Sequence, residues 1–319
     1  MGLAVIFPGQ GIQNAGMGEP WRAHPAWSVV ERAEDAWGRP LGPLLLDPGA
    51  DLSRTREAQL AVLLASLLCW EAVRDRMEPP VAFAGHSLGQ LTALVASGVL
   101  TLEDGVRLTA ARAASSQRAA DRRPGTMAAL LGATVELAQD ACAAAEGACW
   151  VANDNAPGQV VVGGTTAGVK AAGARALELG ARRVLPLNVA GAFHTPLMSD
   201  ARQALLPTLA EVPLAEPSAP VVSNADAVGY RDAEGWRTRL ADHLVSPVRW
   251  RSSVETLSGL GADDFVEVGP GGVLAGLVRR TLPGARARSV AVPTDVDERR
   301  QVAEMQMREN LRVEVRSAG

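Results

Sequence analysis

Residues 81–96 read VAFAGHSLGQLTALVA. They begin with a short apolar run typical of a buried strand, and the part from Leu88 to Ala96 has helical character. The pattern G-x-S-x-G at 85–89 lies between them, in the strand–turn–helix context that a nucleophile elbow requires. Such a turn strains the backbone of its serine and puts the serine oxygen at the N-terminus of a helix, where negative charge is stabilised. Ser87 is therefore a candidate nucleophile, and an inert serine in a structural turn is the alternative.

The chain around this turn alternates short apolar strands with helices. Strands are predicted at 3–7, 81–85, 220–222 and 265–268, and helices at 26–37, 54–77, 88–96, 103–119 and from Pro196. Alternation of this kind predicts an α/β protein whose mostly parallel sheet has helices on its faces. Together with the elbow, it predicts an α/β-hydrolase-like large domain.

The order of predicted strands and helices changes near Arg122-Arg123-Pro124-Gly125. The elements predicted after this point are a strand (127–131), a helix (134–145), two strands (149–152 and 159–163), a helix (166–179) and a strand (183–187). The order βαββαβ is the ferredoxin-like arrangement. We therefore predict a small ferredoxin-like domain at 123–189, inserted into a large domain made of 1–122 and 190–319. Beyond 293 the chain is charged, and a peripheral helix is expected there.

Composition narrows the class of protein. The chain has 319 residues, 47% hydrophobic and 21% charged, which is ordinary for a soluble globular enzyme, and its net charge of -4 argues against a general affinity for nucleic acid. The longest apolar run, 60–70, is too short to span a bilayer and predicts a buried helix. The N-terminus lacks the basic region of a signal peptide. Cys69, Cys142 and Cys149 form no metal-ligand pattern and no obvious disulfide framework, so a cytoplasmic location is expected.

A serine nucleophile needs a general base at neutral pH, and histidine is the obvious candidate. The chain has four histidines. His86 directly precedes the candidate nucleophile and is expected to point away from it, whereas His24 lies near the N-terminus. His194 lies in a loop that leads into a helix, and His243 lies in the segment DHLVSP. The pattern favours His194, and His243 stays open as the second candidate.

At these residues the sequence resembles the malonyl-CoA:acyl carrier protein transacylase family. This family includes free-standing enzymes of fatty-acid synthesis and the acyltransferase domains of polyketide synthases. The matching segments are FPGQGIQ (7–13), GHSLGQ (85–90), VRLTAAR (106–112), NAPGQVVVGG (155–164), GAFHTPLM (191–198), SPVRW (246–250) and EVGPGGVL (267–274). Each segment by itself is weak evidence for the family, but all seven segments in this order are highly specific for it. The resemblance extends to about Arg280.

The resemblance implies a catalytic role for several residues. Ser87 would be the nucleophile and His194 the base, with the backbone carbonyl of His243 holding the second imidazole nitrogen, so that no acidic third member is needed. The family often has glutamine at the position of His243. The backbone N–H groups of Gln10 and Leu88 would form the oxyanion hole, because the glycines beside Gln10 allow backbone to approach closely. A simple tight turn is the alternative interpretation of the segment PGQG alone.

The resemblance also implies which residues select the acyl group. An arginine at the position of Arg112 pairs with the free carboxylate of malonate in this family, because a guanidinium fork matches a planar carboxylate. A surface arginine on a helix is the alternative. The segment GAFH contains Phe193 and resembles the motif of malonyl-selective domains, where a bulky ring would crowd an α-methyl branch. Gln90 stands where the family usually has glutamate, and this change is expected to alter hydrogen bonding beside the elbow.

The implied reaction moves a malonyl group from coenzyme A to the phosphopantetheine thiol of an acyl carrier protein through a malonyl-serine ester. It requires no metal and no redox cofactor. Carrier proteins are acidic, and Arg182 and Arg183 match a basic pair in relatives, although a solvated face is the alternative for any arginine pair. We expect a monomer without a nucleic-acid or membrane partner.

Two other functions remain as alternatives. An acyl-carrier-protein thioesterase with an editing role would use Ser87 and His194 for hydrolysis. Arg112 argues against this alternative, since editing relatives tend to lose that arginine. A non-catalytic scaffold would need none of these groups, and their joint presence argues against it.

Overall fold

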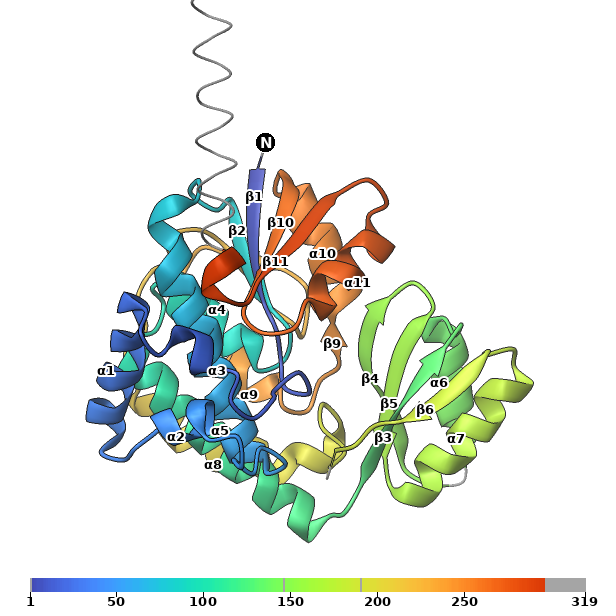
Figure 1. Cartoon of the computed structure of the whole chain (residues 1–319). Coiled ribbons are helices and arrows are strands. Elements are labelled where there is room, and N and C mark those ends of the chain that lie inside the picture. Colours follow the sequence, from blue (N-terminus) through green and yellow to red (C-terminus); the bar gives the residue numbers. More distant parts are fainter. Residues whose placement is uncertain (1, 146, 190, 296–319) are drawn as a thin grey trace, which may run out of the picture.

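The computed structural model describes residues 2–145, 147–189 and 191–295. Its larger sheet has the strand order β11-β10-β1-β2-β7-β8 (Figure 1). The strands are β1 (Gly2–Phe7), β2 (Ala82–Gly85), β7 (Val221–Val222), β8 (Gly229–Tyr230), β10 (Ala262–Val268) and β11 (Arg286–Val290). In the described part of the chain, neighbouring strands of this sheet are parallel except for β7 and β8. The predicted mixed α/β fold with a parallel sheet is confirmed.

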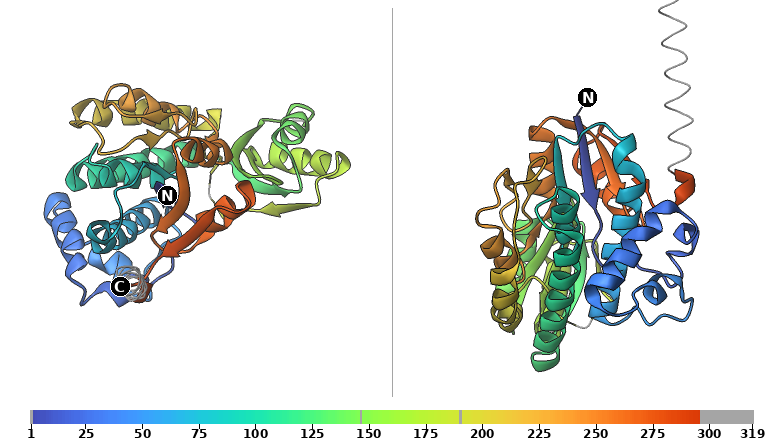
Figure 2. Two further views of the ribbon diagram at one scale, coloured as in Figure 1. Left: turned by 90° about the horizontal axis from the view of Figure 1, so that it is seen from above. Right: turned by 90° about the vertical axis from the view of Figure 1, so that its left-hand side faces the viewer.

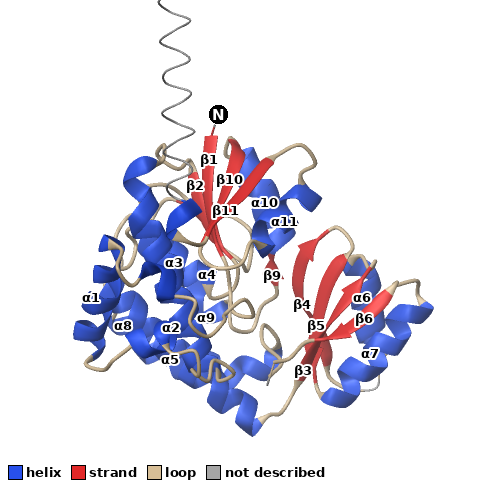
Figure 3. Cartoon of the chain, in the orientation of Figure 1, coloured by secondary structure: helices blue, strands red, loops and turns tan. Residues whose placement is uncertain are grey.

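Side chains of the larger sheet point alternately into two apolar layers. In β1, Val5 and Phe7 face one layer, and Ala4 and Ile6 face the other. The first layer contains α1 (Ser28–Trp37), α2 (Gly42–Leu46), α3 (Thr55–Val73), α4 (Gly89–Ala96), α5 (Leu102–Arg122), α8 (Ser199–Glu211) and α9 (Trp236–Asp242). The second contains α10 (Trp250–Gly259) and α11 (Val273–Thr281). Helices therefore cover both faces of the sheet, which explains why its strands read as apolar runs (Figure 3).

Helix α3 is the predicted buried helix, since every residue from Leu60 to Trp70 is buried. The ring of Trp70 packs edge-to-face against Phe7 and Phe83, which lie on β1 and β2. Such aromatic pairs contribute about 0.5–1.5 kcal/mol each beyond their area burial. This packing holds the adjacent ends of β1 and β2 in place, and the candidate nucleophile follows directly after β2. Four short 3-10 helices complete this part of the chain: η1 (Glu19–Trp21), η2 (Pro25–Trp27), η3 (Arg74–Arg76) and η4 (Pro196–Met198).

A second, smaller sheet has the strand order β6-β3-β5-β4-β9 and lies beside the larger unit (Figure 2). It contains β3 (Thr126–Leu131), β4 (Cys149–Ala156), β5 (Gln159–Gly164) and β6 (Arg183–Pro186), with the helices α6 (Val135–Ala143) and α7 (Thr166–Glu178). The two helices pack on one face through an apolar cluster that includes Leu130 and Val162. The opposite face carries a second cluster, with Met127 and Val161, that contacts Phe193. The element order βαββαβ is present as predicted.

The fifth strand of the smaller sheet comes from outside the range 123–189. Strand β9 (Val248–Arg249) pairs in parallel with β4, and Asn153 is the partner of Val248. Arg280 of α11 also donates a hydrogen bond of 2.9 Å to the backbone carbonyl of Pro157. A strand of two residues leaves no alternation in a sequence, which is why β9 was not predicted. The domain boundaries at 122/123 and 189/190 stay a prediction.

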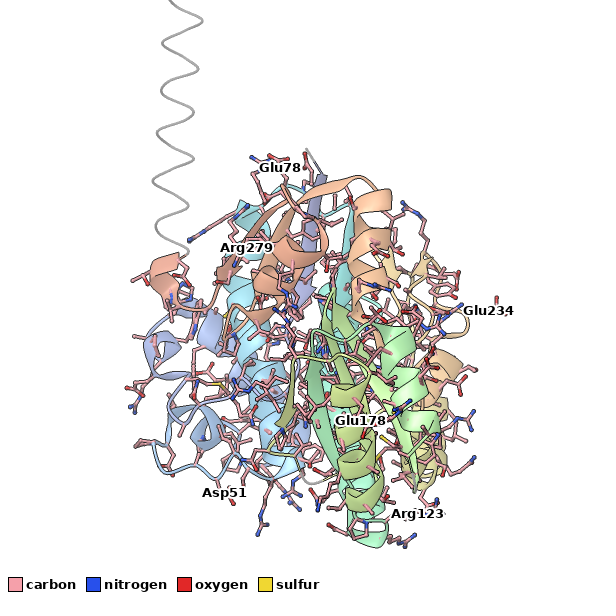
Figure 4. The ribbon with its side chains drawn as sticks, turned by 90° about the vertical axis from the view of Figure 1, so that its right-hand side faces the viewer. Asp51, Glu78, Arg123, Glu178, Glu234 and Arg279 are labelled. Carbon is pink, nitrogen blue, oxygen red and sulfur yellow. The ribbon has the colours of Figure 1, made fainter. Side chains whose placement is uncertain are left out.

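Several charged side chains lie exposed on the outside of the molecule. Figure 4 shows Asp51, Glu78, Arg123 and Glu234 at the periphery of the molecule. No helix in the described residues is both long and apolar enough to cross a membrane. The peripheral helix expected beyond 293 falls almost wholly on residues 296–319, which lie outside the described part of the chain.

Candidate active site

The strand–turn–helix around Ser87 has the backbone of a nucleophile elbow. Ser87 connects β2 to α4 with a φ of 54°, a conformation that stores about 1–3 kcal/mol of strain in a non-glycine residue. The turn is tight, because a Cβ added to Gly85 would lie 1.9 Å from the carbonyl oxygen of Gly89. A Cβ added to Gly89 would lie 2.1 Å from the carbonyl oxygen of Phe7. Both positions therefore require glycine.

Ser87 and His194 are far apart in sequence but in contact in the fold. The Oγ of Ser87 is 2.7 Å from Nε2 of His194, and Nδ1 of His194 is 2.9 Å from the backbone carbonyl oxygen of His243. A carbonyl can only accept a hydrogen bond, so Nδ1 carries the proton and Nε2 is free to accept the serine proton. The ring of His243 packs beside that of His194, with the centroids 4.8 Å apart. Of the two candidate bases, the geometry thus pairs His194 with the serine.

The other two histidines are bound elsewhere. Nε2 of His86 is 2.9 Å from Oδ1 of Asn155 on β4, although the His86 ring still borders the same cavity as Ser87. Nδ1 of His24 accepts a hydrogen bond from the backbone N–H of Ala26 and caps η2. Neither imidazole is therefore placed as a partner of the serine hydroxyl.

Arg112 is the third group that meets Ser87. It lies in α5 and is 6% exposed, which excludes the alternative of a surface arginine. Its Nη2 donates to Oγ of Ser87 at 3.1 Å, and its Nη1 donates to Oε1 of Gln59 at 2.8 Å. Within the described residues, no carboxylate forms an ion pair with it. Burial lowers its pKa to about 10, so it stays a cation at neutral pH. A buried cation without an anionic partner is costly, which points to an anionic ligand.

Gln59 links Arg112 to the loop that follows β1. It is 1% exposed, lies on α3 and donates from Nε2 to Oε1 of Gln10 at 2.9 Å. The backbone N–H groups of Gln10 and Leu88, the two proposed for an oxyanion hole, donate to no acceptor among the described residues. Both N–H groups are therefore available for a ligand oxygen. Sequence reasoning did not identify Gln59 as a site residue.

Asn224, two residues after the end of β7, was also missed by sequence reasoning. Its Oδ1 accepts from the backbone N–H of Ser87 at 2.7 Å, and its Nδ2 donates to the carbonyl of Gly85 at 2.8 Å. Its own backbone N–H donates to Oε1 of Gln90 at 2.7 Å. Gln90 thus still supplies the acceptor that a glutamate would offer, while its buried Nε2 has no partner among the described residues. The available signal was a polar Ser223-Asn224 pair at the carboxyl end of a buried strand, the same sheet edge as the elbow.

Replacing Asn224 with alanine is expected to loosen the elbow. The change leaves the Ser87 N–H and the Gly85 carbonyl unpaired, and each orphaned buried group costs about 1–3 kcal/mol. We expect a lower midpoint of urea unfolding together with slower acylation of Ser87. Ser223→Ala is the matched control, because the buried Ser223 hydroxyl has no partner in the described structure and its loss should be near neutral. Equal stability of both variants would contradict the role of Asn224.

Burial sets the protonation state of the site. The pKa of His194 is lowered to about 3, mainly by burial and then by the nearby Arg112 cation. Burial is also the main cause that lowers the pKa values of His86 and His243. These three imidazoles are therefore neutral at pH 7. A neutral His194 with its Nε2 lone pair toward Ser87 is in the state that a general base needs.

The same shifts predict a loss of stability in mild acid. As the pH falls below about 6.5, histidines of the unfolded chain bind protons while the buried ones stay neutral, so the unfolded state is favoured. Each such histidine contributes a slope of about 1.4 kcal/mol per pH unit, and the free energy of unfolding should be flat above this range. Glu267, whose pKa is raised by burial, opposes the effect over the range between its ordinary pKa and that raised value. Urea melts between pH 5 and 8 test this, and His243→Gln should reduce the slope. A pH-independent midpoint would contradict it.

These groups line one cavity of about 110 Å³. Its polar lining includes Ser87, His194, Arg112, Gln10 and Gln59. Its apolar wall includes Phe193 and Met127. Arg182 and Arg183 do not line it; both are exposed at the start of β6, the strand that leads to the cavity-lining Leu187 and Val189. The described residues contain no group of three or more His, Cys, Asp or Glu side chains that could hold a metal ion.

Comparison with known proteins gives one consistent family. The family model described as the acyl transferase domain matches residues 5–313. The malonyl CoA-acyl carrier protein transacylase of Salmonella typhimurium is 37% identical, covering 91% of this chain and 96% of its own. The crystal structure of an acyl-carrier-protein S-malonyltransferase from Burkholderia pseudomallei has a TM-score of 0.89 at 37% identity, over 93% of this chain and 99% of its own. The structure of a malonyl-transacylase in complex with a type II PKS acyl-carrier protein has a TM-score of 0.89 at 33% identity. The match covers 93% of this chain and 98% of that one. This chain therefore belongs to the acyl transferase family that includes the malonyl CoA-acyl carrier protein transacylases.

Proposed function

We propose that the protein is an acyl-carrier-protein S-malonyltransferase, which moves a malonyl group from coenzyme A to the phosphopantetheine thiol of an acyl carrier protein. The observation that carries this proposal is the buried guanidinium of Arg112, 3.1 Å from the hydroxyl of Ser87 and without a carboxylate partner in the described chain. A cation at that distance can pair with the carboxylate of an acyl group on Ser87 in which one methylene separates the ester carbonyl from the carboxylate. The relatives named above support the same substrate.

The proposed first step acylates Ser87. Nε2 of His194 takes the hydroxyl proton as Oγ attacks the thioester carbonyl, and the Nδ1–H bond to the carbonyl of His243 stabilises the imidazolium that forms. The coenzyme A sulfur then leaves with the proton from His194. The product is a malonyl-serine ester, and the phosphopantetheine thiol of the carrier reverses these steps, which predicts ping-pong kinetics.

The backbone N–H groups of Gln10 and Leu88 are proposed to bind the oxyanion of each tetrahedral intermediate. Leu88 directly follows the nucleophile and precedes α4, so its N–H adds to the positive end of that helix. The hydrogen bond between the Gln59 and Gln10 side chains supports this role by fixing the loop after β1. Every group in the proposed mechanism is a protein group, and it uses no metal or redox cofactor.

Phe193 is proposed to limit the acyl group at its α-carbon. Its ring lines the cavity and packs with the apolar face of the smaller sheet. Phe193→Ala should therefore admit methylmalonyl-CoA, with a rise of about tenfold in its kcat/KM relative to malonyl-CoA, since one methyl group is worth about 1–3 kcal/mol. The ratio is measured by competition between the two thioesters. An unchanged ratio would exclude steric selection by this ring.

The carrier protein is proposed to dock near Arg182 and Arg183. Both side chains are exposed, and β6 leads from them to the wall of the cavity. An acidic carrier would find positive charge there, and its prosthetic group would follow the strand inward. The relative in complex with an acyl-carrier protein supports a partner of this class. We further propose that the protein acts as a monomer in the cytoplasm.

Transfer and hydrolysis can be separated by one experiment. The protein is mixed with malonyl-CoA, with and without phosphopantetheinylated carrier protein, and malonyl-carrier and free malonate are both quantified. We expect malonyl-carrier to dominate when the carrier is present. Free malonate formed at the same rate in both mixtures would instead indicate the thioesterase alternative.

A further inference from the structure

Two cysteines that are separate in the sequence meet in the smaller sheet. Cys142 lies near the end of α6 and Cys149 begins β4, and their Sγ atoms are 3.4 Å apart. Six residues lie between the two positions, and the sequence alone showed no disulfide framework. The third cysteine, Cys69, lies in α3, in the core of the larger unit.

The pair differs from Cys69 in its access to small molecules. Cys142 and Cys149 are 9% and 7% exposed and line a surface cavity of about 490 Å³, between α6, β4 and the loop around Val245. Cys69 is 0% exposed and its Sγ contacts the carbonyl of Ala291. A small oxidant can therefore reach the pair while Cys69 stays shielded, so the chain provides its own internal control.

We propose that Cys142 and Cys149 form a redox-sensitive dithiol that a hydroperoxide converts to a disulfide. A disulfide requires the sulfurs to approach to about 2.05 Å, so they must come closer by little more than an ångström. Cys142 is in the last turn of α6, next to the segment that leads to β4. Nothing in this proposal depends on the acyl transfer reaction.

The two thiols have complementary roles in this oxidation. Cys142 donates its S–H to the sulfur of Cys149, and this hydrogen bond lowers the pKa of Cys149 while that of Cys142 is raised. Cys149 loses its proton, its thiolate attacks one oxygen of hydrogen peroxide, and the O–O bond breaks. The departing hydroxide takes up the proton and leaves as water, so that Cys149 is converted to a sulfenic acid. The sulfur of Cys142 then attacks that sulfur, the S–O bond breaks, and a second water leaves. In sum, two thiols and one hydrogen peroxide give one disulfide and two waters.

The test exposes the protein to hydrogen peroxide, blocks the remaining thiols in denaturant with an alkylating agent and measures the intact mass. We expect the loss of two hydrogens and one alkylated cysteine instead of three, with reversal by a dithiol reductant. Peptide mapping should find the crosslink between Cys142 and Cys149. In Cys142→Ser the reaction should stop at a sulfenic acid on Cys149, which a 1,3-dione traps. Cys69→Ser is the matched control and should form the crosslink like the unaltered chain.

The circular dichroism spectrum and the midpoint of urea unfolding are measured in every variant to show that it is folded, and this control is independent of the proposed acyl transfer. The proposal would be overturned if all three thiols can still be alkylated after peroxide, if Cys149 is oxidised to the sulfinic acid without a crosslink in the unaltered chain, or if the crosslink involves Cys69. A crosslink between two molecules would likewise overturn it, because the 3.4 Å contact lies within one chain.

Discussion

A protein with His194 replaced by alanine is expected to acylate Ser87 at least about a hundredfold more slowly than the unaltered chain, because general-base catalysis contributes about 10²–10⁴ in rate. Nε2 of His194 is the only imidazole nitrogen placed against the Ser87 hydroxyl in the described structure, at 2.7 Å. Without it, the serine must lose its proton to water inside a buried cavity. The measurement is the rate of malonyl-serine formation after rapid mixing with malonyl-CoA.

The control for this variant is His24→Asn. Asparagine keeps the ability to cap a helix, and His24 caps η2 away from the cavity. This control should acylate at the rate of the unaltered chain. His194→Ala with an undiminished rate would transfer the role of base to another group, and His243, whose ring packs beside His194, would be the next candidate.

Arg112→Ala is expected to reverse the preference for a charged acyl group. Losing one member of a buried charge pair costs about 2–5 kcal/mol, so malonyl loading should fall at least about thirtyfold. Acetyl loading should be unchanged or faster, because a neutral acyl group no longer has to lie beside an unpaired buried cation. Intact-mass measurements with malonyl-CoA and acetyl-CoA give both rates. Loss of both activities together would mean that Arg112 supports the fold or the nucleophile instead of selecting the substrate.

Two further variants define what Arg112 contributes. Arg112→Lys keeps the charge but loses the planar fork that matches a carboxylate, so its malonyl loading should lie between those of the unaltered chain and the alanine variant. Arg107→Ala removes an exposed arginine of the same helix, whose partner is Asp104 at 3.5 Å, and should change neither loading rate. Malonyl loading equal to that of the unaltered chain in Arg112→Ala would refute the assigned role.

Several of the predicted elements have a sequence pattern that reflects burial on both faces of a sheet or all round a helix. The runs at 3–7 and 81–85 became β1 and β2, and 60–70 became the buried part of α3. Strand β11 was missed because it is an edge strand with mostly exposed or half-buried side chains, and Arg288 on it pairs with Asp264 of β10. The position of such a strand is determined by its pairing with the neighbouring strand, so its sequence shows no clear hydrophobic pattern.

The residues of the candidate site also fall into a group that the sequence predicts and a group that it does not. Ser87 and the elbow glycines are visible because a tight turn restricts which residues fit. The sequence pattern favoured His194 as the base and the resemblance to a family supported it, whereas Arg112 was supplied by the resemblance. Asn224 and Gln59 are polar residues whose function depends on which backbone group or side chain lies across from them. Only the packing of β7 beside β2, and of α3 beside α5, brings those partners together.

The central claim is that Ser87, His194 and Arg112 form one acyl-transfer site, and intact-mass spectrometry after mixing with a panel of acyl-CoA thioesters tests it most directly. The account predicts a malonyl adduct that maps to Ser87, disappears when holo carrier protein is added and does not form in Ser87→Ala. A malonyl adduct that persists in Ser87→Ala, or an unaltered chain that takes up acetyl but no malonyl groups, would contradict it.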